Sequence, residues 1–213
     1  IIKKEIYQKN HKKIKFPKKY IKRHNIKKSA LKEVIKNFST LNVCVIGDLI
    51  IDEYITCEPL GMSQEDPTIV VTPIDKLKFL GGAGIVAAHA SGLGAKVDLY
   101  SVIGNDKLSS YIDKKVKQFK INSYIYKDES RPTTYKQKFR NSDRTIFKVN
   151  HLHQTPINKT LQNIIFKSIK KKISKYDLIL FSDFNYGALP QELVDRIIKL
   201  SKKNKVMICA DSQ

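Results

Sequence analysis

Short apolar runs alternate with amphipathic segments of helical period along most of this 213-residue chain. The apolar runs are rich in β-branched residues, which favour strands, and the segments between them carry an apolar stripe on one helical face. Strands and helices that alternate in this way form βαβ units with parallel strands. The sequence therefore predicts an α/β fold, a mostly parallel sheet flanked by helices. The predicted strands are 43–46, 97–103, 121–126, 178–181 and 206–210, and the predicted helices are 29–38, 85–91, 107–119, 157–173 and 190–201.

Two stretches interrupt this alternation. Residues 53–79 contain no helical pattern and are divided by prolines into short strand-like runs at 54–55, 68–72 and 77–80. Residues 133–149 have the pattern of a hairpin, with Asn141 and Asp143 in its turn. Both stretches predict a small antiparallel sheet that projects from the main one.

Acidic residues follow the predicted strands. Asp48 and Asp52 come at or just past the end of the first strand, Asp183 ends the fourth and Asp211 ends the fifth. The carboxyl ends of parallel strands share one edge of the sheet, where ligands bind in open α/β folds. Carboxylates at that edge accept hydrogen bonds from hydroxyl groups, so they favour a site for a polar ligand such as a sugar. The alternative is that they cap the helices that follow, or that Asp48 only forms a turn.

A glycine-rich stretch, Gly81–Gly84, opens the alanine-rich helix predicted at 85–91. The free N–H groups of such a helix start can bind an anion or a hydroxyl group. The stretch also fits the dinucleotide fingerprint G-x-G-x-x-[GA], but it does not directly follow the first strand and lacks a suitable acid about 20 residues later. No phosphate-binding G-x-x-x-x-G-K-[ST] motif is present.

The net charge of +20 is concentrated near the N-terminus. Residues 1–40 carry 14 Lys or Arg and 2 Asp or Glu, which gives 14 − 2 = +12. Such a segment can bind nucleic acid or an anionic surface, or it can be a solvated linker. We favour the linker, because the segment lacks interleaved aromatic residues that would stack on bases.

The remaining composition argues against other classes of protein. Cys44, Cys57 and Cys209 show no paired spacing, and we expect Cys44 and Cys209 to be packed thiols in strands of a protein from a reducing compartment. No apolar run reaches the roughly 18 residues of a membrane span, and no signal peptide is visible. His151 and His153 have the spacing of two metal ligands, but no third ligand is nearby, so we expect no metal site there.

Six pieces follow one another along the chain, namely GDLIIDEY (47–54), FLGGAGIVAAHASGLGA (79–95), VIGND (102–106), RPTTYKQKFR (131–140), FSDFNYGAL (181–189) and ICADSQ (208–213). In this order they resemble the PfkB-type (ribokinase-like) carbohydrate kinases, and among them the heptose-phosphate kinases that make lipopolysaccharide precursors. The resemblance runs from about Asn42 to the end of the chain.

The resemblance implies a role for individual residues. It implies that Asp52 binds sugar hydroxyls, that the glycine stretch lines the sugar site and that Lys136 faces the substrate, although Lys136 can also be read as an exposed strand lysine. The implied substrate-binding residues are Asp52, Gly81, Gly82, Ala83, Gly84, Lys136 and Asp183, with Asp211 on the nucleotide side.

The resemblance also implies the reaction and the partners. The expected reaction is in-line transfer of the γ-phosphoryl group of ATP to a sugar hydroxyl with Mg²⁺. Residues 53–80 and 133–149 would form a lid over the sugar that also holds a homodimer together. We further expect a cytoplasmic protein, with no membrane partner, whose basic segment follows an upstream nucleotidyltransferase domain.

In domain terms, residues 1–40 are expected to be a basic linker and lead-in helix, and residues 41–213 the N-terminal part of a carbohydrate kinase domain. The family's catalytic aspartate lies in a Gly-Ala-Gly-Asp-like motif that this chain does not contain, so we assign no catalytic residue within it. Where the family's glycine motif carries an asparagine, this chain has Ile85 or Val86. The other hypotheses are a non-catalytic remnant that binds sugar or dimerises, and a nucleic-acid-binding protein.

Overall fold

The structure is a computed structural model that describes residues 17–212, and the chain divides into two compact units, Ile1–Asn37 and Phe38–Gln213. The described part of the first unit holds two helices, α2 (Lys18–Arg23) and α3 (Lys28–Asn37), with no buried residue in either. Thus α3 confirms the predicted lead-in helix within one residue, while α2 is a second helix, in the segment that we expected to be a linker. The linker prediction for residues 1–16 falls outside the described residues.

The second unit is built on a parallel sheet, sheet A. Its strands are β1 (Asn42–Gly47), β4 (Lys96–Ile103), β5 (Asn122–Lys127), β8 (Leu178–Asp183) and β9 (Met207–Ser212). They lie in the order β5-β4-β1-β8-β9, and every neighbouring pair is parallel. The predicted α/β fold with a mostly parallel sheet is therefore confirmed.

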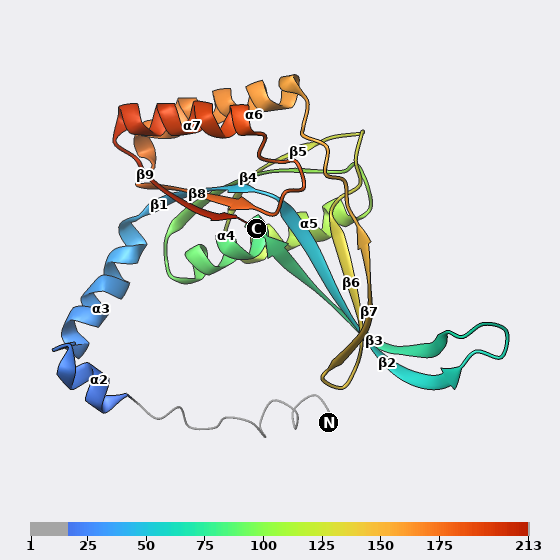
Figure 1. The fold of residues 1–213 in the computed structure, drawn as a ribbon. Coiled ribbons are helices and arrows are strands. Elements are labelled where there is room, and N and C mark those ends of the chain that lie inside the picture. The colour runs from blue at the N-terminus through green and yellow to red at the C-terminus, as the bar shows by residue number, and fades with distance from the viewer. Residues whose placement is uncertain (1–16, 213) are drawn as a thin grey trace. The chain divides into compact units, whose positions relative to one another are not determined.

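Helices cover both faces of sheet A (Figure 1). On one face lie α4 (Ala83–Gly92) and α5 (Leu108–Gln118), and on the other lie α6 (Lys159–Lys172) and α7 (Gln191–Asn204). Short 3₁₀ turns at Phe38–Thr40 and Ile173–Lys175 complete the helical elements. Two apolar cores result, one that includes Val45 and Leu99 and one that includes Ile46 and Ile179, because successive strand residues point to opposite faces.

A second sheet, sheet B, has the order β3-β2-β6-β7. Its strands are β2 (Leu49–Met62), β3 (Ile69–Gly82), β6 (Tyr135–Asn141) and β7 (Arg144–His151). The β2–β3 and β6–β7 pairs are antiparallel, and β2 and β6 pair in parallel. The predicted hairpin is confirmed. The short strands predicted within 53–80 are instead parts of two 14-residue strands, whose irregularities near Cys57 and Pro59 absorb the prolines.

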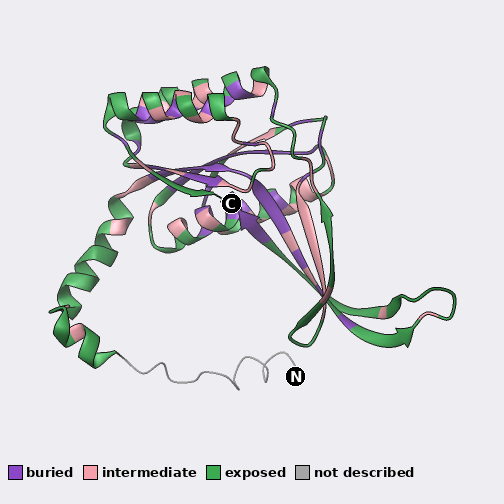
Figure 2. Ribbon diagram, viewed as in Figure 1, coloured by how far each residue is buried: buried purple, intermediate pink, exposed green. Residues whose placement is uncertain are grey.

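The two sheets are buried to different extents. The start of β2 and the end of β3 are buried, while the far parts of both strands are exposed (Figure 2). Cys44 and Cys57 are buried free thiols, but Cys209 is exposed, which corrects our prediction for it, because β9 is an edge strand with a single neighbour. Among the helices of the described residues, none has the length and apolar character needed to cross a membrane.

Candidate sugar-binding site

The path of the chain after β1 decides where Asp52 lies. Gly47 ends β1, Asp48 makes the turn, and β2 starts at Leu49 as a strand of sheet B. Asp52 is therefore the fourth residue of β2, beside Phe79 of β3 and Lys136 of β6, and not at the carboxyl end of a sheet A strand as predicted. The prediction was wrong about this placement because the chain passes from one sheet to the other at a single residue.

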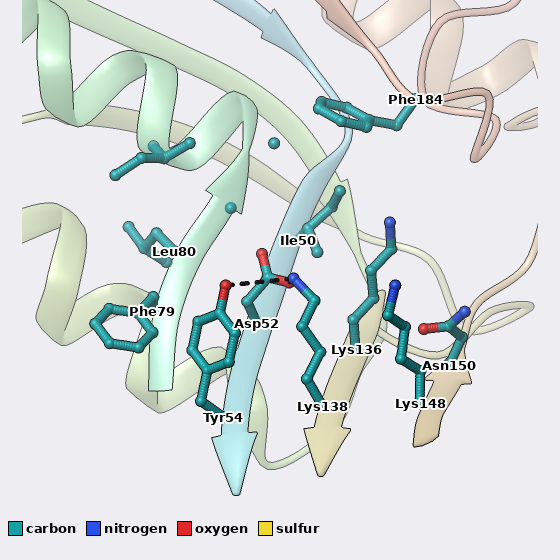
Figure 3. A pocket seen from close by; sticks show the side chains of 13 residues that line it. Ile50, Asp52, Tyr54, Phe79, Leu80, Lys136, Lys138, Lys148, Asn150 and Phe184 are labelled. Atoms are coloured by element: carbon teal, nitrogen blue, oxygen red, sulfur yellow. Dashed lines mark hydrogen bonds and ion pairs between the residues drawn. The ribbon is translucent and has the colours of Figure 1, made fainter. Parts of the chain in front are cut away.

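A cavity of about 590 Å³ opens beside Asp52 (Figure 3). Its walls come from all four strands of sheet B, the start of α4 and the loop after β8. The lining residues are Ile50, Asp52, Tyr54, Phe79, Leu80, Gly81, Gly82, Ile85, Lys136, Lys138, Lys148, Asn150 and Phe184. A volume of this size, with apolar walls and a few convergent polar groups, is typical of a site for a small molecule.

Asp52 is paired within the cavity. Its Oδ1 lies 3.2 Å from Nζ of Lys138, and the same amino group lies 3.4 Å from the hydroxyl of Tyr54 and over the Tyr54 ring. Burial alone lowers the pKa of Lys138, but the charge of Asp52 and the hydrogen bonds outweigh burial and raise that pKa. Lys138 therefore stays protonated at neutral pH and holds the Asp52 carboxylate in a defined direction.

Two further lysines face the cavity from the same side of sheet B (Figure 3). The amino group of Lys136 lies 4.8 Å from the ring centre of Tyr186 and 5.8 Å from that of Phe184. Lys148 lies opposite Lys138 on β7 and is exposed. No carboxylate of the described residues pairs with Lys136 or Lys148. The cavity thus holds three lysines and one carboxylate, an arrangement that suits an anionic ligand.

The glycine stretch forms the wall next to Asp52. A Cβ at Gly81 would lie 2.3 Å from Oδ2 of Asp52, and a Cβ at Gly82 would lie 2.1 Å from the backbone oxygen of Asp48. Gly82 also has a φ of 52°, a backbone conformation that residues with a side chain rarely adopt. Gly81 and Gly82 line the cavity, whereas Ala83 and Gly84 are buried at the start of α4 and do not line it.

The other acids of the predicted cluster lie outside the cavity. Asp183, at the end of β8, is half-buried, and its Oδ1 accepts the backbone N–H of Asn185. Asp211 is an exposed residue of β9 in register with Ser182. Asp48 is buried and its carboxylate accepts hydrogen bonds from three backbone N–H groups. We had expected Asp48 to be available to a ligand, and these bonds correct that prediction.

Sequence reasoning missed several side chains of the cavity, namely Tyr54, Phe79, Lys138, Lys148, Asn150 and Phe184. For Lys138 a signal was present, because it lies two residues after Lys136 in a predicted strand and therefore shares its face. The hairpin register then brings Asn150 opposite Lys136. No local pattern indicated Phe184, which reaches the cavity from a loop far along the chain.

The histidine pair shows no metal-site geometry. Nε2 of His151 lies 3.3 Å from Oε1 of Gln137, and Nε2 of His153 lies 3.4 Å from the hydroxyl of Thr155. Residues 17–212 contain no group of three or more His, Cys, Asp or Glu side chains arranged to hold a metal ion.

Comparison with known sequences points to one family. The profile described as pfkB family carbohydrate kinase matches residues 40–213. The chain is 32% identical over 180 residues to the bifunctional protein HldE of Sulfurimonas denitrificans, covering 84% of this chain and 38% of that protein. It is 33% identical over 171 residues to HldE of Helicobacter hepaticus, covering 78% of this chain and 35% of that protein. The chain thus spans little more than a third of the length of these relatives.

Solved structures share the fold at low sequence identity. A putative phosphofructokinase from Staphylococcus aureus superposes with a TM-score of 0.64 at 15% identity, over 80% of this chain and 52% of that one. Arabidopsis thaliana ribokinase, solved with ribose and ATP, superposes with a TM-score of 0.58 at 15% identity, over 80% of this chain and 53% of that one. Because the family profile matches residues 40–213 and the relatives are more than 30% identical over most of the chain, the chain belongs to the pfkB family of carbohydrate kinases.

Proposed function

We propose that the protein phosphorylates a sugar that already carries a phosphate group, with ATP as the phosphoryl donor. The observation that carries this proposal is the cavity of sheet B, in which one carboxylate lies beside a glycine turn and three lysines. The Asp52 carboxylate accepts hydrogen bonds from sugar hydroxyls and so orients the ring. Gly81 leaves room for that carboxylate, because a Cβ at Gly81 would lie 2.3 Å from Oδ2 of Asp52 and would force the carboxylate to move.

The excess of positive charge supports a phosphorylated substrate. Lys138 is balanced by Asp52, but Lys136 and Lys148 have no acidic partner among the described residues. A phosphate group carries nearly two negative charges at neutral pH and accepts several hydrogen bonds, so it complements these two amino groups. A heptose phosphate fits this chemistry, and the likeness to the HldE proteins favours it.

The described residues do not by themselves make a site for ATP and Mg²⁺. At the carboxyl edge of sheet A, β8 ends in Asp183 and β9 carries the exposed Asp211, and residues 17–212 hold no cluster of three ligating side chains. We therefore derive no step through the nucleotide or the metal. ATP supplies the phosphoryl group when bound, and the residues of this chain bind the sugar, orient its hydroxyl and exclude water.

Exclusion of water is the role that we assign to sheet B as a lid, residues 53–80 and 133–149. Its cavity face carries the rings of Tyr54 and Phe79, packed edge to face with centres 5.6 Å apart. An apolar wall next to the reacting hydroxyl keeps water from competing as the acceptor. We expect residues 1–213 alone to bind the sugar without turnover, and ADP release by that stretch would contradict this.

The same sheet is our proposed contact for a homodimer. The far parts of β2 and β3 expose large apolar side chains, and such a patch on a strand pair favours association. These side chains are Leu60, Met62, Ile69, Val70 and Ile74. We also propose a cytoplasmic enzyme that is joined to a nucleotidyltransferase domain. A monomer by light scattering at the concentrations of the assay would contradict the dimer.

ADP release by the full-length protein, measured with a panel of heptose and hexose phosphates, tests the proposed function. We expect release with one sugar phosphate, and we expect Asp52→Asn to lower kcat/KM at least about 100-fold, because the sugar loses its orienting acceptor. Asp113→Asn, at an exposed acid on α5 outside the lid, is the control and should leave kcat/KM unchanged. A folded protein that binds a sugar phosphate but never releases ADP would favour the non-catalytic remnant.

The phosphate contact is tested at Lys136 and Lys148. We expect Lys136→Met and Lys148→Met each to raise KM for the sugar phosphate about tenfold, the effect of losing one charged hydrogen bond. Activity toward the same sugar without its phosphate should change less than twofold. Lys167→Met, on the exposed side of α6, is the matched control. An equal loss of activity with the sugar phosphate and with the unphosphorylated sugar would show that these lysines do not bind the phosphate group.

A further inference from the structure

Asp48 does not itself line the cavity, but its buried carboxylate is hydrogen-bonded to Phe184, which does. Asp48 is 3% exposed. Its Oδ2 accepts the backbone N–H of Phe184 at 2.9 Å and that of Tyr186 at 3.2 Å, and its Oδ1 accepts the N–H of Ala188 at 3.1 Å. Three donors from one loop, about 140 residues away in the sequence, therefore converge on a single side chain.

That loop, residues 184–188 between β8 and α7, supplies part of the cavity. Phe184 lines the cavity, and the rings of Phe184 and Tyr186 face the amino group of Lys136. The outer side of the loop is also held. Nη1 of Arg131 donates to the backbone oxygen of Tyr186 at 3.2 Å, and the N–H of Ile157 donates to the oxygen of Gly187 at 3.0 Å.

The backbone of Asp48 joins two more parts of the cavity. Its N–H donates to the oxygen of Ser182 at 3.1 Å, and its oxygen accepts the N–H of Ala83 at 2.9 Å, directly after the glycines of the wall. Asp52 follows four residues later on β2. Thus β2, the glycine turn and the loop after β8 all meet at one residue.

We infer that Asp48 is a positioning residue of the sugar site, whose buried carboxylate fixes the 184–188 loop against the glycine turn and β2. This inference rests on the proposed function, because it assigns Asp48 to the geometry of the sugar site and not to contact with the sugar. A carboxylate suits the position because both oxygens accept and neither donates. In Asp48→Asn one oxygen is replaced by an NH₂ group, which would face a backbone N–H and lose at least one of the three bonds.

The control is Asp98, a second buried carboxylate with three partners. It is near the start of β4, away from the cavity, and accepts from Tyr176, Lys172 and Asn122. Asp98→Asn removes a comparable buried charge without touching the 184–188 loop. Any effect shared by Asp48→Asn and Asp98→Asn is an effect on folding, and any difference reports on the cavity.

Two measurements on the full-length protein test the inference, at a temperature where both variants remain folded. Hydrogen exchange should accelerate at least about tenfold for the amides of residues 184–188 in Asp48→Asn and not in Asp98→Asn, since only the first frees those donors. In the ADP-release assay, Asp48→Asn should raise KM for the sugar phosphate, leave KM for ATP nearly unchanged and lower kcat/KM about 100-fold. Asp98→Asn should change only the fraction of active protein.

Unchanged exchange at residues 184–188, or the same kinetic loss in both variants, would overturn the inference. A wild-type protein without turnover would overturn the proposed function and the sugar-site role with it, while the exchange measurement would still decide whether Asp48 holds the loop. If Asp48→Asn does not fold, Arg131→Lys replaces it. That substitution keeps the charge beside Asp128 but loses the bond to the Tyr186 oxygen, and it should raise KM for the sugar phosphate in the same way.

Discussion

Two neighbouring acids on β2 have different environments because side chains alternate along a strand. Asp52 points into the cavity, whereas Glu53 points to the other face of sheet B and is 3% exposed. Glu53 accepts hydrogen bonds from the Tyr135 hydroxyl and from Nε2 of Gln137 at 2.8 Å, and it lies 3.6 Å from Nζ of Lys78. These contacts hold β2 against β6 and β3, and so hold Asp52 in register with Lys136.

The pKa of Glu53 makes this contact dependent on pH. Burial raises that pKa, but the hydrogen bonds from Tyr135 and Gln137 and the charge of Lys78 outweigh burial, so it lies below the usual 4.5. A lowered pKa means that ionised Glu53 stabilises the fold above about pH 4.5 and that this contribution is lost as the pH falls through the folded-state pKa.

We therefore expect Glu53→Gln to lower the free energy of unfolding by about 1–3 kcal/mol at pH 7. The difference between wild type and Glu53→Gln should shrink as the pH is lowered below about 4.5. Urea unfolding at a series of pH values measures both quantities. A difference that is constant with pH would show that Glu53 does not stabilise the fold through its charge.

At the scale of elements, the site depends on how closely backbones approach where β3 passes into α4. Only glycine fits at position 82, because the φ of Gly82 is 52° and a Cβ there would lie 2.1 Å from the backbone oxygen of Asp48. At the other end of α4, Gly92 has open space around its Cβ position. The structure therefore requires the glycine that precedes α4, Gly82, and does not require the glycine that ends it, Gly92.

We expect Gly82→Ala to destabilise the protein by about 3 kcal/mol or more, through backbone strain and a steric clash at the turn. Gly92→Ala, the control in the last position of α4, should be neutral or stabilise by up to about 1 kcal/mol, as alanine does in helices. Thermal unfolding of both variants compares them. Similar losses at the two positions would mean that the turn relaxes to admit a side chain.

At the scale of the whole molecule, charge and core are divided between the two units. Residues 1–37 carry a net charge of 14 − 2 = +12, and α2 and α3 contribute no buried residue. Both apolar cores and the whole cavity belong to the unit Phe38–Gln213. This division favours the hypothesis that the basic segment is a linker.

Deleting residues 1–37 from the full-length protein should therefore leave the unfolding temperature within about 2 °C, a change that corresponds to less than about 1 kcal/mol. Any binding of the protein to DNA at low salt should disappear when residues 1–37 are deleted, because such binding would arise from the positive charge of that segment. A loss of more than about 5 °C would show that residues 1–37 stabilise the unit Phe38–Gln213. DNA binding that survives the deletion, or that resists salt, would revive the nucleic-acid hypothesis.

The order and type of nearly all elements of sheet A and its helices were predictable from the sequence, because a strand and a helix impose periods of 2 and 3.6 on apolar residues. The sequence also predicted the glycine stretch and, through the family resemblance, assigned Asp52 and Lys136 to one sugar site; both side chains line the cavity of sheet B. Element ends shifted by a few residues, and the lengths of β2 and β3 were underestimated, since prolines interrupt a local pattern without ending a strand that bulges can extend.

Which of the acids faces the cavity depends on contacts between segments that are distant in the sequence. Asp48 and Asp52 look alike in the sequence, but the first is buried by a loop from 184–188 and the second opens into a cavity shared with β6. Lys138 lines the cavity because of the register between β2 and β6, and Phe184 lines it because a distant segment folds against it. The pattern of a short segment reveals neither the strand register nor the contact between distant segments, because both depend on residues that become neighbours only after folding.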